Sequence, residues 1–296
     1  HVDRKKLFIT TKLNLSWGDA SKKGIKDRFM KCLERMKTDY ADCLMIHMCM
    51  LDQIKHENFH AVAKELKAEG KLKFTGVSSH GQEQQIYGTS KDPMEKVVIG
   101  AAQDGRFDVA LFVYNFLQKE QGEKIIEACA KSNMGVTLMK TNPVNVYKRR
   151  KASMDKRTAQ GKPPSEKLKK RMADYRAYLE KAEDFKKKHG LKSEADIRDA
   201  AIKFVLSHPG VHTVCPSIHN FDDVEIFAAL SGQKLLSREK AMLNSYETEA
   251  GFLYCRHACG QCEPSCPHGV PVNTIMRFNH YFEVQGREKH AMMLYT

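Results

Sequence analysis

The sequence predicts an α/β protein of the (β/α)8 TIM-barrel type, followed by a small helical module at the C-terminus. Six short apolar runs start at residues 7, 43, 73, 109, 135 and 211. This spacing is typical of repeated strand and helix units, whose right-handed crossovers give a parallel sheet. Polar residues end most of these runs, at the edge where barrel active sites are built. Ordinary loops would also begin with polar residues. The spacing alone also suits a doubly wound sheet. A doubly wound dinucleotide-binding sheet would carry G-x-G-x-x-G after its first strand, and no such motif follows the first run.

The expected strands are short and rich in β-branched or aromatic residues. They are "LFITTK" (7–12), "CLMIHM" (43–48), "KFTGVSS" (73–79), "VALFVYN" (109–115), "GVTLMK" (135–140) and "VHTVCP" (211–216). Apolar residues at helical spacing predict helices over 21–37 and 58–69, around Ile125 to Cys129, and around Ala201 to Val205.

A basic insertion of about residues 141–192 separates the last two expected strands. Residues 141–164 have little periodicity and are interpreted as a loop, and Ser165 is expected to cap a helix with an apolar stripe that ends near Phe185. Residues 148–192 hold 17 Lys and Arg against 6 Asp and Glu, which is +11 of the total net charge of +13. Because the aromatic residues lie mostly on the apolar stripe rather than among the basic residues, nucleic-acid binding is the weaker interpretation of this charge.

The composition indicates a globular protein in a reducing compartment. Five of the nine cysteines lie within apolar periodic stretches, where free thiols pack as small hydrophobes. No apolar run is long enough to cross a bilayer. The expected location is the cytoplasm, with twin-arginine export left open because the chain starts at His1 without an initiator Met.

Four further cysteines gather in the pattern C-x3-C-x2-C-x3-C-P. They are Cys255, Cys259, Cys262 and Cys266. A [4Fe–4S] cluster needs thiolates that converge from a tight loop, and C-x2-C-x3-C-P is similar to the ferredoxin pattern. Zinc is the alternative, although structural zinc more often uses two separated cysteine pairs. Cys266 or a distant thiol such as Cys215 would complete the cluster, and a short helix is expected around Val272 to Phe278.

Several segments together resemble the aldo-keto reductase family, specifically members with a C-terminal ferredoxin-like module. The segments are "FITTK", "RMKTDYADCLMIHM", "AVAKELKAEGKLKFTGVSSH", "FDVALFVYNFL", "MGVTLMK" and "VLSHPGVHTVCPSIHN". The resemblance covers roughly residues 5–250. It implies a barrel over residues 1–250 and an iron–sulfur module over residues 251–296.

The resemblance implies a catalytic Asp, Tyr, Lys and His that reduce carbonyl groups with hydride from a nicotinamide. The family's Lys corresponds to Lys12 and its His to His47. Its Asp and Tyr lie on the first two strand and helix units, whereas this chain begins just before the third strand. The sequence is therefore expected to be a fragment of a longer polypeptide or to be completed by a partner segment.

The resemblance also implies positions that contact the nucleotide, and several of them are changed here. The family's Asn after the fifth strand is Ser79, its Gln on the sixth strand is Leu111, and its Gly after the Pro of the eighth strand is Ser217. The expected nucleotide contacts are Ser78, Ser79, Lys140, Ser217 and Asn220.

Two functions follow from these patterns. The first is an NAD(P)-linked oxidoreductase that interconverts small carbonyls and alcohols and carries an associated [4Fe–4S] cluster, with a possible electron-transfer partner. The alternative is a non-catalytic barrel that serves as a scaffold for an iron–sulfur electron-transfer or interaction protein.

Overall fold

The structure is a computed structural model that describes residues 3–80, 92–142, 158–159, 161, 184–191, 194–218, 220–250, 263–279 and 292. The chain forms two compact units. The first comprises His1–Val113, Glu120–Met139 and Gly210–Thr213. The second comprises Tyr114–Lys119, Lys140–Pro209 and Val214–Thr296. The predicted boundary near residue 250 adjoins residues outside those described, so it stays a prediction.

A six-stranded sheet runs through the first unit, and its spatial order follows the chain from β1 to β6. The strands are β1 (Thr10–Leu13), β2 (Ala41–Ile46), β3 (Leu72–Ser79), β4 (Val109–Val113), β5 (Gly135–Met139) and β6 (Thr213–Val214). Each of the pairs from β1 to β5 is parallel. Right-handed crossovers between strands added in one direction place all their helices on one face. This is the arrangement of a (β/α)8 barrel, whereas a doubly wound sheet carries helices on both faces.

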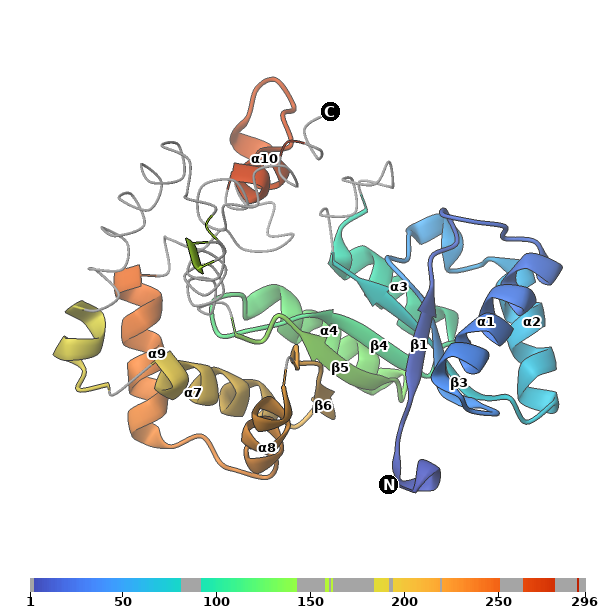
Figure 1. The fold of residues 1–296 in the computed structure, drawn as a ribbon. Helices are drawn as coiled ribbons and strands as arrows, with labels where there is room; N and C mark the ends of the chain where they lie inside the picture. Colours follow the sequence, from blue (N-terminus) through green and yellow to red (C-terminus); the bar gives the residue numbers. More distant parts are fainter. Residues whose placement is uncertain are drawn as a thin grey trace. The chain divides into compact units, whose positions relative to one another are not determined.

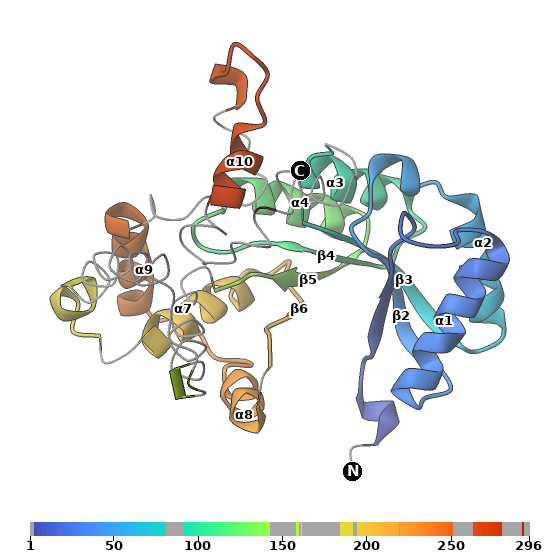
Figure 2. The same cartoon turned by 45° about the horizontal axis from the view of Figure 1, so that its top comes forward.

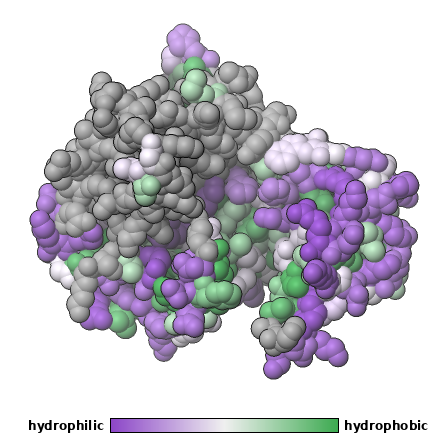
Figure 3. Space-filling view, in the orientation of Figure 1, coloured by the Kyte–Doolittle hydropathy of each residue, from purple (hydrophilic) through white to green (hydrophobic). Residues whose placement is uncertain are grey.

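Four helices connect the first five strands and cover one face of the sheet. They are α1 (Lys22–Met36), α2 (Glu57–Ala68), α3 (Met94–Asp104) and α4 (Glu120–Lys131). Figures 1 and 2 show them along the same outer side of the curved row of strands. Their inner faces are buried, and Figure 3 shows that the surface over α1 and α2 is mainly hydrophilic.

The local sequence explains where α1 begins and ends. Ser21 caps its start, because the Ser21 hydroxyl accepts a hydrogen bond from the Gly24 N–H at 3.1 Å. Ile25, Phe29 and Leu33 form the buried stripe that the sequence predicts. Lys37 ends the helix in the left-handed conformation, with φ of 52°.

The structure confirms the predicted strands in place but changes their limits. The first begins at Thr10 rather than residue 7, because the Ile9 N–H donates to the side chain of Asp42 at 2.9 Å and only the Ile9 carbonyl bonds to the main chain of β2. The last has only two residues, Thr213 and Val214, and the adjacent His212 N–H donates to the Val136 carbonyl at 3.1 Å. Helix α3 was not predicted.

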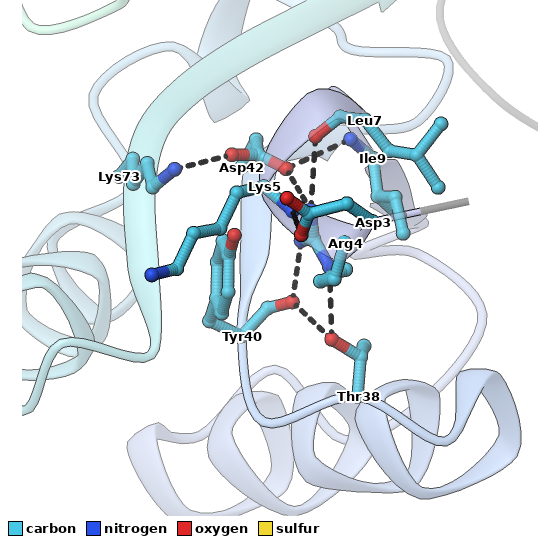
Figure 4. Close-up of polar contacts among 9 residues, drawn as sticks. All are labelled: Asp3, Arg4, Lys5, Leu7, Ile9, Thr38, Tyr40, Asp42 and Lys73. Atoms are coloured by element: carbon cyan, nitrogen blue, oxygen red, sulfur yellow. Dashed lines mark hydrogen bonds and ion pairs between the residues drawn. The ribbon is translucent and has the colours of Figure 1, made fainter. Parts of the chain in front are cut away.

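An ionic cluster at the amino-terminal edge of the sheet fixes the segment before β1 (Figure 4). Asp42, which is 3% exposed, accepts from Arg4 at 2.9 Å and from Lys73 at 2.7 Å. The Arg4 guanidinium also lies 3.8 Å from the centre of the Tyr40 ring and donates to the Thr38 hydroxyl at 3.0 Å. We call these five residues the Asp42 cluster; they join the segment before β1 to β2 and β3.

The second unit has its own apolar core. The helices in its described residues include α7 (Glu194–Leu206), α8 (Phe221–Ala229), α9 (Ser237–Ala250) and α10 (Val272–Asn279). The core holds Phe116, Leu117, Phe185, Ile197, Ala200, Ala201, Met242, Leu243 and Tyr246. Tyr246 packs edge-on against Phe116 and Phe185, with ring centres 5.9 and 5.2 Å away. Helices α8 and α9 were not predicted, whereas α7 and α10 were.

Most of the basic insertion lies outside the described residues, including the predicted Ser165 cap. Phe185, the last member of its predicted apolar stripe, is buried in the core of the second unit. Among the described residues, no helix has the length and apolar character needed to cross a membrane.

Candidate functional site

The carboxyl ends of β1, β2 and β3 meet at one edge of the first unit and bring three predicted residues onto one face. Lys12 is in register with Met45, and Met45 is in register with Gly76. Side chains alternate between faces along a strand. Counting by two from Met45 and Gly76 therefore places His47 and Ser78 on the face that bears Lys12.

This face requires a glycine at position 76. A Cβ atom on Gly76 would lie 2.5 Å from the Val109 carbonyl oxygen and 3.0 Å from Met45 Cγ. The close approach of β3 and β4 therefore depends on the missing side chain.

His47 is the first residue after β2 and is fixed by the sheet. Its backbone N–H donates to the Leu13 carbonyl at 2.8 Å, which continues the pairing of β1 and β2 beyond their ends. Burial and, to a smaller extent, the charge of Lys12 lower the pKa of His47 from 6.5 to about 4. The imidazole is thus neutral near pH 7, and one of its nitrogens can donate a hydrogen bond while the other accepts.

Lys12 lies on β1 with an exposed side chain. Water therefore reaches the ammonium group, and the lysine keeps its charge without a cost of burial. Its charge nevertheless acts on His47, as the lowered pKa of the histidine shows. The structure thus brings Lys12 and His47 together, as the sequence predicts.

Two aromatic rings beside His47 were not identified as site residues from the sequence. Trp17 lies edge-on to His47 with ring centres 6.3 Å apart, and His80 does so at 6.2 Å. Trp17 is 47% exposed. The sequence signal available was their position, because Trp17 follows β1 by four residues and His80 follows β3 directly.

Ser78 and Ser79 end β3, and both are fully buried. The Ser78 hydroxyl accepts from the Met48 N–H at 3.2 Å and lies 3.4 Å from the Ile46 carbonyl oxygen. Ser79 falls on the opposite face by strand alternation. The Ser78 hydroxyl is therefore engaged by the main chain around His47.

These contacts show which described residues could bind the substrate and which could bind a nicotinamide. A neutral histidine beside a lysine suits the binding of a carbonyl oxygen. Ser78 does not fit a contact to the carboxamide, because its hydroxyl bonds to the main chain and its neighbour in register is the apolar Leu111. The residues therefore fit the substrate end of such a site, and Ser78 does not fit the cofactor contact.

The remaining predicted nucleotide contacts lie in the second unit. Lys140 follows β5 in the left-handed conformation, with φ of 54°, and its carbonyl accepts from the Asn115 side-chain amide at 3.1 Å. Ser217 and Asn220 are exposed. The Asn220 side chain accepts from the Asp223 N–H at 2.8 Å and caps α8. Contact of Lys140, Ser217 and Asn220 with a nucleotide therefore stays a prediction.

Of the four clustered cysteines, only Cys266 lies within the described residues. Its thiol is partly buried, its N–H donates to the Glu263 carbonyl at 3.0 Å, and its carbonyl accepts from Gly269 at 3.3 Å. Cys255, Cys259 and Cys262 lie in the stretch 251–262, outside the described residues. The described ranges contain no group of three or more potential metal ligands, and the predicted cluster is therefore untested.

The other cysteines are mostly buried, as their apolar surroundings predict. Burial raises the pKa of the thiols of Cys43 and Cys129 to about 12, and it also raises the pKa of Cys49. Cys32 is partly buried and Cys215 is exposed.

Comparisons with known proteins identify the family. The chain is similar to an aldo/keto reductase from Klebsiella pneumoniae whose structure contains NADP and acetate, at 16% identity and a TM-score of 0.51, over 82% of this chain and 71% of that chain. It is also similar to an aldo-keto reductase from Bacillus halodurans in its holo form, at 18% identity and a TM-score of 0.49, over 82% of this chain and 72% of that chain. No curated protein gave a match. The model of the "Aldo/keto reductase family" matches residues 1–245, and the chain therefore belongs to that family.

Proposed function

We propose that this chain provides the substrate site of an NAD(P)-linked oxidoreductase that interconverts small carbonyls and alcohols and carries a [4Fe–4S] cluster. The observation that carries the first part is a neutral His47 held beside Lys12 at the carboxyl edge of the sheet. Family membership and the NADP in the Klebsiella pneumoniae structure support the choice of cofactor.

In this proposal His47 binds and orients the oxygen of the substrate. Its neutral imidazole donates one N–H to a carbonyl oxygen, and the positive charge of Lys12 stabilises the negative charge that grows on that oxygen during reduction. Trp17 and His80 flank the imidazole, and both rings are edge-on to it. A nicotinamide, when bound, would supply the hydride to the carbonyl carbon, and water, which reaches the site at the exposed Lys12, would supply the proton to the oxygen; oxidation of an alcohol would reverse both transfers.

The proposed [4Fe–4S] cluster rests on the four clustered cysteines that could be its ligands. Four thiols within twelve positions suit a [4Fe–4S] cluster, and Cys255, Cys259, Cys262 and Cys266 would hold it in a module over residues 251–296. The cluster would exchange electrons with a partner protein or with the substrate site.

Trp17 provides a direct test of nucleotide binding. It is the only tryptophan of the chain, and its ring is in contact range of His47. We expect NADH or NADPH to quench its emission saturably, and we expect the same quenching in a Lys31→Met control on the outer surface of α1. Absence of saturable quenching with both nucleotides would rule out a nicotinamide at this site.

Turnover tests the role of His47. A panel of simple aldehydes is reduced with the nucleotide that binds, and His47→Gln is compared with the unchanged protein. We expect the variant to lose about 10²- to 10⁴-fold in kcat/KM while the nucleotide affinity is kept. Equal turnover by both proteins would contradict the role proposed for His47.

Metal analysis tests the cluster. Protein purified without oxygen should be brown and should contain iron and acid-labile sulfide in equal amounts, and Cys255→Ser, Cys259→Ser or Cys262→Ser should remove the colour. Cys32→Ser is the matched control and should keep it, and Cys215→Ser should also keep it because Cys266 is the proposed fourth ligand. Colourless protein that contains zinc would contradict the assignment.

A non-catalytic scaffold is the second candidate, and the engagement of the Ser78 hydroxyl by the main chain favours it. A scaffold would show the iron and sulfide without saturable quenching of Trp17. The two experiments above therefore separate the candidates.

A further inference from the structure

We infer that Ser78 and Asn14 are positioning residues for His47, so that the hydroxyl of Ser78 acts through the main chain and not on a cofactor. The inference rests on the role proposed for His47. Ser78, whose position in the sequence suggests a nucleotide contact, would then support the main chain at His47 instead.

Ser78 holds the main chain on both sides of His47 from β3. Its hydroxyl accepts from the Met48 N–H at 3.2 Å and lies 3.4 Å from the Ile46 carbonyl oxygen, and its own carbonyl accepts from the Cys49 N–H at 2.8 Å. Ile46 and Met48 directly flank His47, and Cys49 follows Met48. Ser78 is 0% exposed, so a ligand could reach its hydroxyl only if the packing around it changed.

The backbone at Met48 explains why such support is needed. Met48 has φ of 55°, a left-handed conformation that is unfavourable for a long side chain. Such a conformation persists only where the surroundings fix it. The hydrogen bond from the Met48 N–H to Ser78 therefore helps to keep the turn that directs the His47 ring.

Asn14 holds the same turn from the side of β1. Its side-chain amide donates to the His47 carbonyl at 3.2 Å, and its side-chain oxygen accepts from the Ser16 N–H at 2.8 Å. Gln53 donates to the Ser16 hydroxyl at 3.0 Å and accepts from the Met50 N–H at 3.3 Å. The segments after β1 and β2 are thus cross-linked around His47.

The consequence is a fixed position of the imidazole among its titratable neighbours. Among the described residues, Lys12 from β1 and His80 after β3 are the titratable groups that face His47. When the turn loosens, the imidazole gains water and departs from Lys12, and both changes favour its protonated form.

The test compares Ser78→Ala with Ser78→Thr, which keeps a hydroxyl, and with Asn14→Ala. Thr75→Val is the matched control, because Thr75 is also buried on β3 but its hydroxyl contacts the Arg106 carbonyl and Asp108 at 2.9 and 3.1 Å. Trp17 emission is followed against pH, since protonated imidazole quenches a neighbouring indole, and His47→Gln identifies the step that belongs to His47.

Ordinary histidines titrate over the range of about pH 5 to 8. In that range we expect no step in Trp17 emission in the unchanged protein, in Ser78→Thr or in Thr75→Val. Ser78→Ala and Asn14→Ala should show a step there, and kcat/KM should fall by up to about 10²-fold with the nucleotide affinity unchanged. A tenfold or larger loss of nucleotide affinity in Ser78→Ala, without a step, would overturn the inference. If His47→Gln keeps full turnover, the proposed function fails, while the emission step still reports whether Ser78 fixes the ring.

Discussion

At the scale of single residues, the ionisation of His47 is set by two causes of unequal size. Burial is the larger cause and the charge of Lys12 the smaller, and together they lower the pKa to about 4. Because the unfolded chain would take up a proton near the ordinary value of 6.5, His47 makes the folded state less stable as the pH falls from 6.5 towards 4. The neutral ring is therefore a property that the fold maintains at a cost in stability in acid.

Removing the charge of Lys12, the smaller cause, should return the pKa of His47 only part of the way to its ordinary value. In Lys12→Met we expect the pKa of His47 to rise above 4 but to stay below 6.5, because burial remains. Histidine resonances followed by NMR against pH, assigned with His47→Gln, measure the shift. Lys31→Met should leave it unchanged, and a pKa in Lys12→Met equal to that of the unchanged protein would show that the lysine has no electrostatic effect.

At the scale of elements, the Asp42 cluster ties together segments that the sheet alone does not join. Burial raises the pKa of Asp42, but hydrogen bonds from the Ile9 N–H, Lys73 and Arg4 outweigh burial and lower it below 3.8. The carboxylate therefore contributes stability above about pH 4, which is lost as the pH falls through the lowered pKa of the folded state.

Neutralising this carboxylate should destabilise the first unit. We expect Asp42→Asn to lower the free energy of unfolding at pH 7 by about 1–3 kcal/mol, because charged hydrogen bonds are weakened at a buried position. Urea denaturation followed by Trp17 emission measures the loss, which should shrink as the pH falls below about 4. Asp27→Asn, at an exposed pair on α1, is the control. A loss that is the same at all pH values would mean that charge is not the cause.

The elements also show what the sequence can and cannot predict. Apolar periodicity and the Ser21 cap place α1 correctly, because both signals are local. The start of β1 is missed because the Ile9 N–H bonds to Asp42, which is 33 residues away. Helix α3 contains Val97, Val98 and Gly100, which have low helix propensity, and packing overrides that propensity.

In the candidate site, too, some features can be predicted from the local sequence and others cannot. Strand ends predict that Lys12 and His47 meet, since parallel strands end at one edge. Trp17 and His80 reach His47 from loops, whose course no periodicity gives. The partners of the Ser78 hydroxyl depend on the turn at Met48, a conformation that the sequence around it does not indicate.

At the scale of the whole molecule, each compact unit has a core of its own. The first is organised by the sheet and the second by α7, α9 and the buried ring of Tyr246. The single tryptophan belongs to the first unit, so its emission reports on that unit, whereas circular dichroism reports on both.

A cavity in the second core should therefore affect one unit. We expect Tyr246→Ala to destabilise the second unit by about 3–5 kcal/mol, because a buried aromatic ring is lost. Thermal unfolding should then show an earlier loss of helical dichroism while the midpoint of Trp17 emission stays in place. Tyr246→Phe keeps the ring and should shift the dichroism much less. Equal shifts of both signals in Tyr246→Ala would mean that the two units unfold together.

The order of the strands has a consequence for synthesis on the ribosome. Each strand from β2 to β5 pairs with the one made just before it, and pairing of β1 with β2 needs nothing translated after Ile46 and His47. Ser78 emerges about thirty residues later than His47. The nascent chain can thus build its sheet strand by strand, and the turn that carries the His47 imidazole gains its support only when the third strand docks.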